Sequence, residues 1–94
     1  MQAYRNRLTI IADVLSVALT SIDEGGASPS VLMRRSNLSY RGLERLLSQL
    51  LSAGFLMERR ETRGVRYVVS AKGAEYLAKY HQFENFAESY GLQL

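Results

Sequence analysis

The stretch Ser39–Val69, SYRGLERLLSQLLSAGFLMERRETRGVRYVV, decides the fold of this 94-residue chain. Its first half predicts an α-helix over 39–53, because leucines recur at intervals of three and four and therefore fall on one helical face. Ser39 can cap the first turn through its hydroxyl, and Gly54 can close the last turn in a left-handed conformation. The apolar face consists of Leu43, Leu46, Leu47, Leu50 and Leu51.

The opposite face of the 39–53 helix carries polar side chains that can contact phosphates or the edges of bases. Arg41 is the strongest candidate, because side chains in the first turn reach base edges once a helix enters a major groove about 12 Å wide. Tyr40 is ambiguous, since its ring can serve the core while only its hydroxyl reaches a nucleic acid. The full set is Tyr40, Arg41, Glu44, Arg45, Ser48 and Gln49.

Residues 55–60 and 65–69 predict two β-strands joined by a glycine-containing turn at 61–64. The second strand is rich in β-branched and aromatic residues, whereas the first begins apolar and ends charged, so we expect the tip to project into solvent. A hairpin beside a duplex meets the backbone first, which makes its arginines candidates for phosphate or minor-groove contacts. These arginines are Arg59, Arg60, Arg63 and Arg66.

Positive charge is concentrated in the middle of the chain. The net charge is +3, but residues 1–30 and 71–94 each hold two cations against three acids, while residues 31–70 hold eight arginines against three glutamates. The planar fork of arginine can grip phosphate or guanine at two points. A solvated surface explains any one of these arginines, but their joint placement on a helix and a hairpin favours a nucleic acid. Arg34 and Arg35 belong to the same set.

Two further helices are expected before residue 39. Apolar periodicity predicts a core helix from Tyr4 to about Ser21. A second, short helix begins with Ser28 as its cap and Pro29 in its first turn, and runs to about Arg35. Residues 36–38 then form a short turn, so the second helix and the 39–53 helix together predict a helix-turn-helix.

A long last helix is predicted from Ala71 to about Tyr90, with Ser70 as its cap and Gly91 after its end. Its aromatic residues follow the spacing of a two-heptad coiled-coil seam, and an exposed apolar stripe of this size usually marks an interface, so we expect a homodimer. Packing of Tyr76, Leu77 and Tyr80 on the first helix is an equally good alternative. The predicted interface consists of Tyr76, Tyr80, Phe83, Phe86, Ala87 and Tyr90.

Several classes of protein are excluded by composition. The chain has no cysteine and a single histidine, His81, so we expect no structural zinc site and no other metal or cofactor. It contains no phosphate-binding loop or nucleophile elbow, so we expect no enzyme and no small-molecule substrate. No run approaches the roughly 20 apolar residues that span a bilayer, and we expect a single cytoplasmic domain. The simplest interpretation of Glu84 and Glu88 is that they form part of a solvated helix face.

Four short segments resemble archaeal winged-helix regulators: Asn37–Tyr40, Ala53–Leu56, Tyr67–Ser70 and Lys72–Gly73. The short length and the terminal helix are similar to the small, ten-kilodalton DNA-binding proteins of thermophilic archaea within that group. The resemblance covers nearly the whole chain. It implies a mainly α fold with a β-hairpin (α+β), namely a winged helix-turn-helix over 1–70 and a C-terminal dimerisation helix over 71–94.

The resemblance further implies a homodimer, formed by antiparallel packing of the terminal helices, that binds double-stranded DNA as a nucleoid-associated chromatin protein or a transcriptional regulator. The 39–53 helix would enter the major groove, and the hairpin 58–66 would act as the wing on the backbone or in the minor groove. The implied DNA contacts are Ser39, Tyr40, Arg41, Arg45, Ser48 and Gln49 on the helix, Arg34 and Arg35 before it, and Arg59, Arg60, Arg63 and Arg66 on the wing.

Two other functions stay open on the sequence. Glu44, Glu58 and Glu61 dilute the basic face, which is compatible with a protein-interaction module that does not bind DNA. RNA or single-stranded DNA binding usually needs aromatic residues interleaved with basic ones on a sheet or groove, whereas most aromatic residues here lie on the terminal helix.

Overall fold

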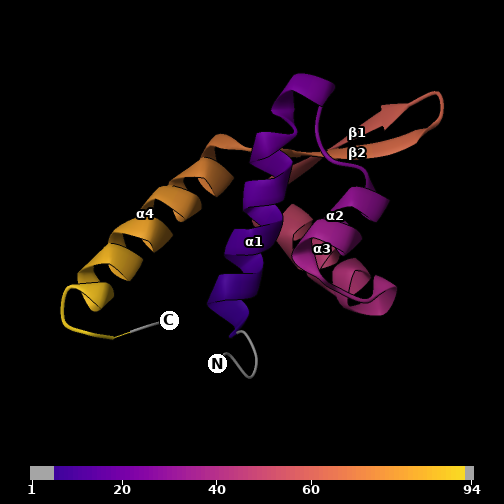
Figure 1. Ribbon diagram of the computed structural model, residues 1–94. Helices are drawn as coiled ribbons and strands as arrows, with labels where there is room; N and C mark the ends of the chain where they lie inside the picture. The colour runs from indigo at the N-terminus through magenta and orange to yellow at the C-terminus, as the bar shows by residue number, and fades with distance from the viewer. Residues whose placement is uncertain (1–5, 93–94) are drawn as a thin grey trace.

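The computed structural model describes residues 6–92. In Figure 1, helix α1 runs through the middle of the molecule, α2 and α3 lie on one side of it, α4 lies on the other, and the β-hairpin extends outward. The elements in chain order are α1 (Arg7–Thr20), a 3-10 turn η1 (Ile22–Glu24), α2 (Pro29–Ser36), α3 (Tyr40–Ala53), β1 (Leu56–Glu61), β2 (Gly64–Val69) and α4 (Ala71–Glu88). The predicted α+β class, a winged helix-turn-helix, is confirmed.

The predicted caps of α2, α3 and α4 are present. In each case a serine hydroxyl accepts a hydrogen bond from a backbone N–H three residues later, which satisfies one of the unpaired donors of the first turn. At the other end of α3, Gly54 has φ 80°, the left-handed conformation expected of it. The capping serines are Ser28, Ser39 and Ser70.

The predicted ends of α1 and α2 agree with the structure to within one residue, but the start of α1 differs. Helix α1 begins at Arg7, because the backbone of Asn6 is extended and its side chain accepts from the N–H of Thr9 at 2.9 Å. The expected start, Tyr4, lies outside the described residues. Helix α2 continues to Ser36 and is closed by Asn37 in the left-handed conformation, with φ 55°. Asparagine tolerates this conformation better than most residues that carry a side chain.

The hydrophobic core draws on every helix and on the hairpin. Leu15 of α1, Leu32 of α2, Leu43 of α3 and Leu56 of β1 are fully buried. The leucine face of α3 is buried as predicted, with Leu51 half-buried at its margin. Because these side chains turn inward, the polar residues of α3 face outward.

The hairpin pairs in an antiparallel register that runs from Leu56 opposite Val69 to Glu61 opposite Gly64. Its turn is therefore only two residues long, and the prediction of a four-residue turn was wrong, because residues 61 and 64 belong to the paired strands. Strand β2 also exchanges two backbone hydrogen bonds with the α1–α2 connection, at 3.0 and 2.8 Å between Ala27 and Tyr67. No local sequence pattern predicted this bridge.

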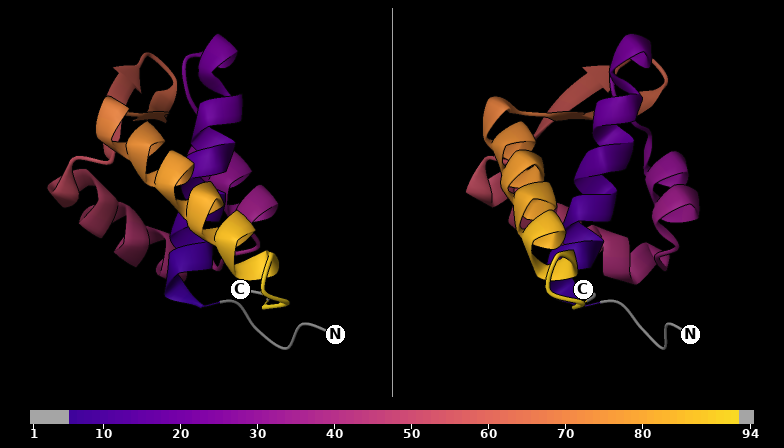
Figure 2. Two further views of the ribbon diagram at one scale, coloured as in Figure 1. Left: turned by 90° about the vertical axis from the view of Figure 1, so that its left-hand side faces the viewer. Right: turned by 60° about the vertical axis from the view of Figure 1, so that its left-hand side comes forward.

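Helix α4 packs against α1, crossing it in the left view of Figure 2 and lying beside it in the right view. Leu77 is buried in the core. The Tyr76 hydroxyl donates to the Leu8 carbonyl at 3.0 Å, and the Tyr80 hydroxyl lies 3.1 Å from that of Thr9. Burial and then Tyr80 raise the pKa of the Tyr76 hydroxyl above its ordinary value. The first half of α4 therefore packs on its own domain.

The end of α4 is folded back. The helix stops at Glu88, slightly earlier than predicted, and Gly91 follows with φ 80°. The N–H of Leu92 donates to the Ala87 carbonyl at 3.0 Å, the long hydrogen bond of a Schellman cap. Within residues 6–92, none of the helices combines the length and the apolar character needed to cross a bilayer.

Gly73 sets the distance between α4 and the backbone of Phe55, the residue before β1. A Cβ at this position would lie 2.3 Å from the Phe55 carbonyl oxygen, a backbone atom. We expect Gly73→Ala to lower the free energy of unfolding by about 1–3 kcal/mol, because the helix must move away from the strand. Chemical denaturation followed by far-UV circular dichroism measures this change.

Gly42→Ala in α3 is the matched control for Gly73→Ala. The nearest atom to its Cβ is the Ser39 hydroxyl oxygen at 3.1 Å, the end of one side chain, so we expect a smaller effect. Equal losses in the two variants would contradict the close approach at Gly73.

Candidate nucleic-acid interface

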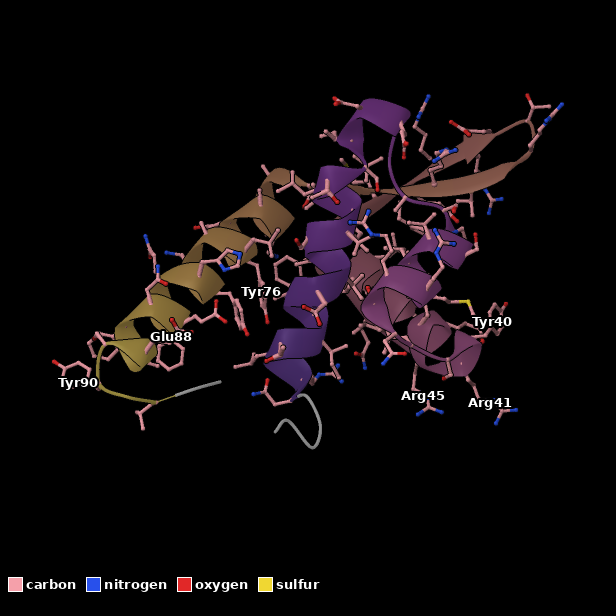
Figure 3. The ribbon with its side chains drawn as sticks, viewed as in Figure 1. Tyr40, Arg41, Arg45, Tyr76, Glu88 and Tyr90 are labelled. Atoms are coloured by element: carbon pink, nitrogen blue, oxygen red, sulfur yellow. The ribbon has the colours of Figure 1, made fainter. Side chains whose placement is uncertain are left out.

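The outer face of α3 presents the polar residues that the sequence predicted for it. Tyr40, Arg41, Arg45, Ser48 and Gln49 are all exposed. Figure 3 shows Arg41 and Arg45 projecting from α3 away from the core, with Tyr40 near them. Within residues 6–92, no carboxylate forms an ion pair with either arginine. This face therefore carries positive charge that the described part of the domain does not neutralise.

Ser39 stands at the edge of this face. Its hydroxyl oxygen accepts from the Gly42 N–H at 3.0 Å, so the side chain is held by the cap. The hydroxyl can still donate to an acceptor outside the protein, because a serine oxygen accepts and donates at once.

A hollow of about 440 Å³ separates α3 from the hairpin. Its lining is mainly apolar, with Leu43, Leu47 and Val65 among the residues, and it includes the carboxylate of Glu44. Tyr67 lies at the hairpin side, and burial followed by the Glu58 carboxylate raises the pKa of its hydroxyl. The hollow itself is therefore poorly suited to hold a phosphate.

The four hairpin arginines do not share one environment. Arg59 and Arg66 are directly opposite each other and donate to the carbonyls of Gly25 and Gly26, at 3.0 and 2.9 Å. Both also form an ion pair with Glu61 at 3.2 Å. These two predicted DNA contacts therefore bind the α1–α2 connection and hold the hairpin against it.

The other two hairpin arginines project further. The side chain of Arg60 is 80% exposed and lies 3.7 Å from the Glu58 carboxylate, a weak surface pair. Arg63 is exposed in the two-residue turn. Arg34 and Arg35 are likewise exposed, in the last turn of α2. These four side chains are available to a nucleic acid.

Arg7 is a residue that the sequence interpretation did not assign to this surface. The guanidinium of Arg7 donates to the side-chain oxygen of Gln49, 42 residues away in the chain. Arg7, Arg45 and Gln49 line a second hollow, of about 290 Å³, on the side of α3 next to the start of α1. No local pattern predicts this contact, because it depends on how α1 crosses α3.

The second half of α4 and the residues that follow it carry an exposed apolar patch, formed by Phe83, Phe86, Tyr90 and Leu92. Phe86 is 60% and Tyr90 71% exposed, and their rings lie 5.2 Å apart. With Ala87, these residues line a hollow of about 350 Å³, and none of the described side chains in this lining is charged. Figure 3 places Tyr90 at the end of α4 that is remote from the hairpin.

His81 and the acidic residues of α4 form no metal site. His81 is exposed, and its Nδ1 lies 3.4 Å from the Glu84 carboxylate. Within residues 6–92, no three histidine or acidic side chains lie close enough together to hold a metal ion.

Comparisons with known proteins point to one fold. A sequence model described as winged helix-turn-helix matches residues 4–88. The DNA-binding protein Sso10a-2 from Sulfolobus solfataricus has a similar structure, with a TM-score of 0.77 and 20% identity over 90% of this chain and 84% of that one. A search of curated protein sequences finds no match.

Two further solved structures share the fold. A putative DNA-binding protein from Ralstonia eutropha matches with a TM-score of 0.59 and 26% identity, over 77% of this chain and 94% of that one. The zinc-dependent MarR-family transcriptional regulator AdcR, in its Zn(II)-bound state, matches with a TM-score of 0.57 and 15% identity. That match covers 87% of this chain and 55% of AdcR.

The ties between the hairpin and the α1–α2 connection should contribute to stability. We expect Arg66→Ala to lower the free energy of unfolding by about 1 kcal/mol, because it removes one bond to the Gly26 carbonyl and one to Glu61, both partly exposed. Arg63→Ala, in the turn, is the control and should leave stability unchanged. Denaturation curves for the two variants provide the test, and equal stabilities would show that the ties contribute nothing.

Proposed function

Because this chain belongs to the winged helix-turn-helix family, we propose that it binds double-stranded DNA, with α3 in the major groove and the hairpin against the backbone or the minor groove. The observation that carries this proposal is the distribution of arginine. Exposed guanidinium groups occur at the end of α2, on the outer face of α3 and on the hairpin. Neutralising phosphates with such groups releases counterions and supplies most of the affinity for a duplex.

The roles of the residues on α3 follow from their positions. Tyr40 and Arg41 lie in the first turn, from which side chains can reach base edges. Arg45 and Ser48 lie about one and two turns further along the same exposed surface, where they would contact the next bases or the flanking phosphates.

The arginines outside α3 divide into two groups. Those that are exposed beside α3 would contact phosphates, whereas Arg59 and Arg66 would hold the hairpin in position, since the Gly25 and Gly26 carbonyls already bind them. The proposed phosphate contacts are Arg34, Arg35, Arg60 and Arg63.

The similar structures support this proposal. Sso10a-2 is described as a DNA-binding protein, the Ralstonia protein as a putative one and AdcR as a transcriptional regulator. We propose that this chain is likewise a non-enzymatic DNA-binding protein of the cytoplasm, associated with the nucleoid as a transcriptional regulator or a chromatin component.

We also propose that two copies associate through the second half of α4. The patch formed by Phe83, Phe86, Tyr90 and Leu92 is exposed, and a second copy of it would remove these aromatic surfaces from water. Tyr76 and Tyr80 would contribute less, because both already bind α1. The sequence predicted a DNA-binding domain over 1–70 and a dimerisation helix over 71–94. On this proposal the two parts overlap, because the first half of α4 packs on α1 and its second half would form the dimer.

Glu58 and Glu61 no longer favour a pure protein-interaction module. Both glutamates pair with arginines of the same hairpin, and Glu61 pairs with the two arginines that face the α1–α2 connection. Of the three glutamates that dilute the basic face, only Glu44 lies on α3. Arg63 pairs with neither glutamate, and the pair between Arg60 and Glu58 is long and exposed, so both arginines can still contact a phosphate.

The proposal predicts salt-sensitive binding to a mixed-sequence duplex. The logarithm of the binding constant should fall linearly with the logarithm of the salt concentration, with a slope set by the number of phosphates that the protein neutralises. The double variant Arg41→Ala/Arg63→Ala should bind more weakly and give a slope that is shallower by about 0.9 for each phosphate that is no longer neutralised. Fluorescence anisotropy across a salt series measures both quantities.

A variant with the same net charge but an intact surface is the control for this experiment. Gln82→Glu/Asn85→Asp also lowers the net charge by two, at exposed positions of α4 outside the proposed interface. It should retain the slope of the wild type. Failure of the wild type to bind at low salt would refute DNA binding and favour the protein-interaction module.

The proposed homodimer predicts that one charge in the patch gives a monomer. Phe86→Glu should abolish association, because the buried carboxylate would have no partner in the apolar interface. Asn85→Glu places the same charge on an exposed neighbour and should leave the dimer intact. Sedimentation equilibrium separates the two outcomes, and a monomeric wild type would refute the interface.

A further inference from the structure

Different elements lie on the two sides of helix α3. The hairpin lies on one side and the first turn of α1 on the other, with α3 between them in Figure 1. The hollow next to α1, about 290 Å³ in volume, brings Arg7 of α1 together with Arg45 and Gln49 of α3. Arg7 is far from Arg45 and Gln49 in the sequence, and no sequence pattern assigned a role to it.

The two hollows beside α3 differ in charge. The one next to the hairpin has Glu44 in its lining, whereas the one next to α1 is lined by two arginines and, among residues 6–92, by no acidic residue. Within residues 6–92, Arg45 has no ion-pair partner. Two neighbouring cations that no carboxylate compensates repel each other, so an anion placed between them is stabilised by both.

The geometry of Arg7 suits an oxyanion. A guanidinium carries five N–H donors, and the bond to the Gln49 oxygen uses only part of this set. The same bond restricts the orientation of a long side chain that would otherwise lose rotamer freedom on binding. Arginine prefers partners such as phosphate, whose oxygens accept two parallel hydrogen bonds.

We propose that Arg7 and Arg45 bind a backbone phosphate of the duplex in the hollow between α1 and α3, with Gln49 holding Arg7 in place. This inference rests on the proposed binding of double-stranded DNA and adds a second phosphate site to it. Arg60 and Arg63 contact the backbone on the hairpin side of α3, while Arg7 and Arg45 contact it on the other side. The two strands that border one major groove are then held from both flanks of the helix.

Charge and shape at residue 7 can be separated by two substitutions. Arg7→Gln removes the charge but keeps an N–H donor for Gln49, whereas Arg7→Lys keeps the charge and removes the planar fork. We expect Arg7→Gln to make the salt slope for a mixed-sequence duplex shallower by about 0.9, the value for one neutralised phosphate. Arg7→Lys should retain the slope with a lower affinity, because lysine acts as a point charge.

The controls distinguish a phosphate contact from a structural role. Gln49→Ala removes the partner of Arg7 but no charge, so it should lower the affinity for the duplex while the slope stays that of the wild type. Asn85→Asp lowers the net charge by one at an exposed position of α4 and should change neither the affinity nor the slope. Circular dichroism and melting curves verify that each variant is folded.

The possible outcomes distinguish failure of the phosphate site at Arg7 from failure of DNA binding. A wild type that binds with a steep slope, together with an unchanged slope in Arg7→Gln, would overturn the second phosphate site and leave DNA binding intact. A wild type that does not bind would overturn both. If inorganic phosphate, at an ionic strength matched with chloride, raised the melting temperature only when Arg7 is present while the duplex slope did not change, the hollow would bind free phosphate instead of DNA.

Discussion

Burial of the leucine face of α3 is the constraint on which the candidate interface depends. Leu43, Leu46, Leu47 and Leu50 are removed from water between the other helices and the hairpin, and each such side chain stabilises the fold by about 1.5–3 kcal/mol. A helix that is fixed through one face cannot rotate, so its opposite face is fixed as well. Arg41 and Arg45 therefore point outward as a consequence of packing, and no polar contact is needed to orient them.

In the hairpin, contacts within the protein offset the repulsion between neighbouring arginines. Arg59 and Arg66 lie directly opposite each other, and like charges in such a cross-strand pair are unfavourable. Glu61 offsets this repulsion from within the hairpin, and the carbonyls of Gly25 and Gly26 do so from the α1–α2 connection. Both glycines have a positive φ, and a Cβ on Gly25 would lie 1.9 Å from the Arg59 guanidinium. Two arginines thus position the hairpin on which two others remain exposed.

The sequence predicts the features that depend on neighbours in the chain. Capping serines and the leucine period of α3 act within a few residues, and the structure reproduces them. Interactions between distant segments were missed, namely the bond from Arg7 to Gln49, the bridge between Ala27 and Tyr67, and the ties at Arg59 and Arg66. These depend on the angles at which helices cross, which side-chain periodicity does not encode. The pattern identified the arginines of α2, α3 and the hairpin but could not tell which of them the backbone would engage.

Helix α4 connects the proposed DNA-binding surface on α3 to the proposed dimer interface. Its first turn is bound to the end of α3, because the Ser70 hydroxyl donates to the Gly54 carbonyl at 2.6 Å and the Lys72 amine donates to the Ala53 carbonyl at 2.9 Å. The Lys72 amine also lies 5.3 Å from the centre of the Phe55 ring. The patch at the far end of α4 is therefore held at a fixed position relative to α3 of the same chain. In a homodimer formed through that patch, the separation of the two α3 helices would follow from the length and direction of α4. Half-sites on one face of a duplex are about 34 Å apart, so α4 would determine whether the dimer occupies one duplex or joins two.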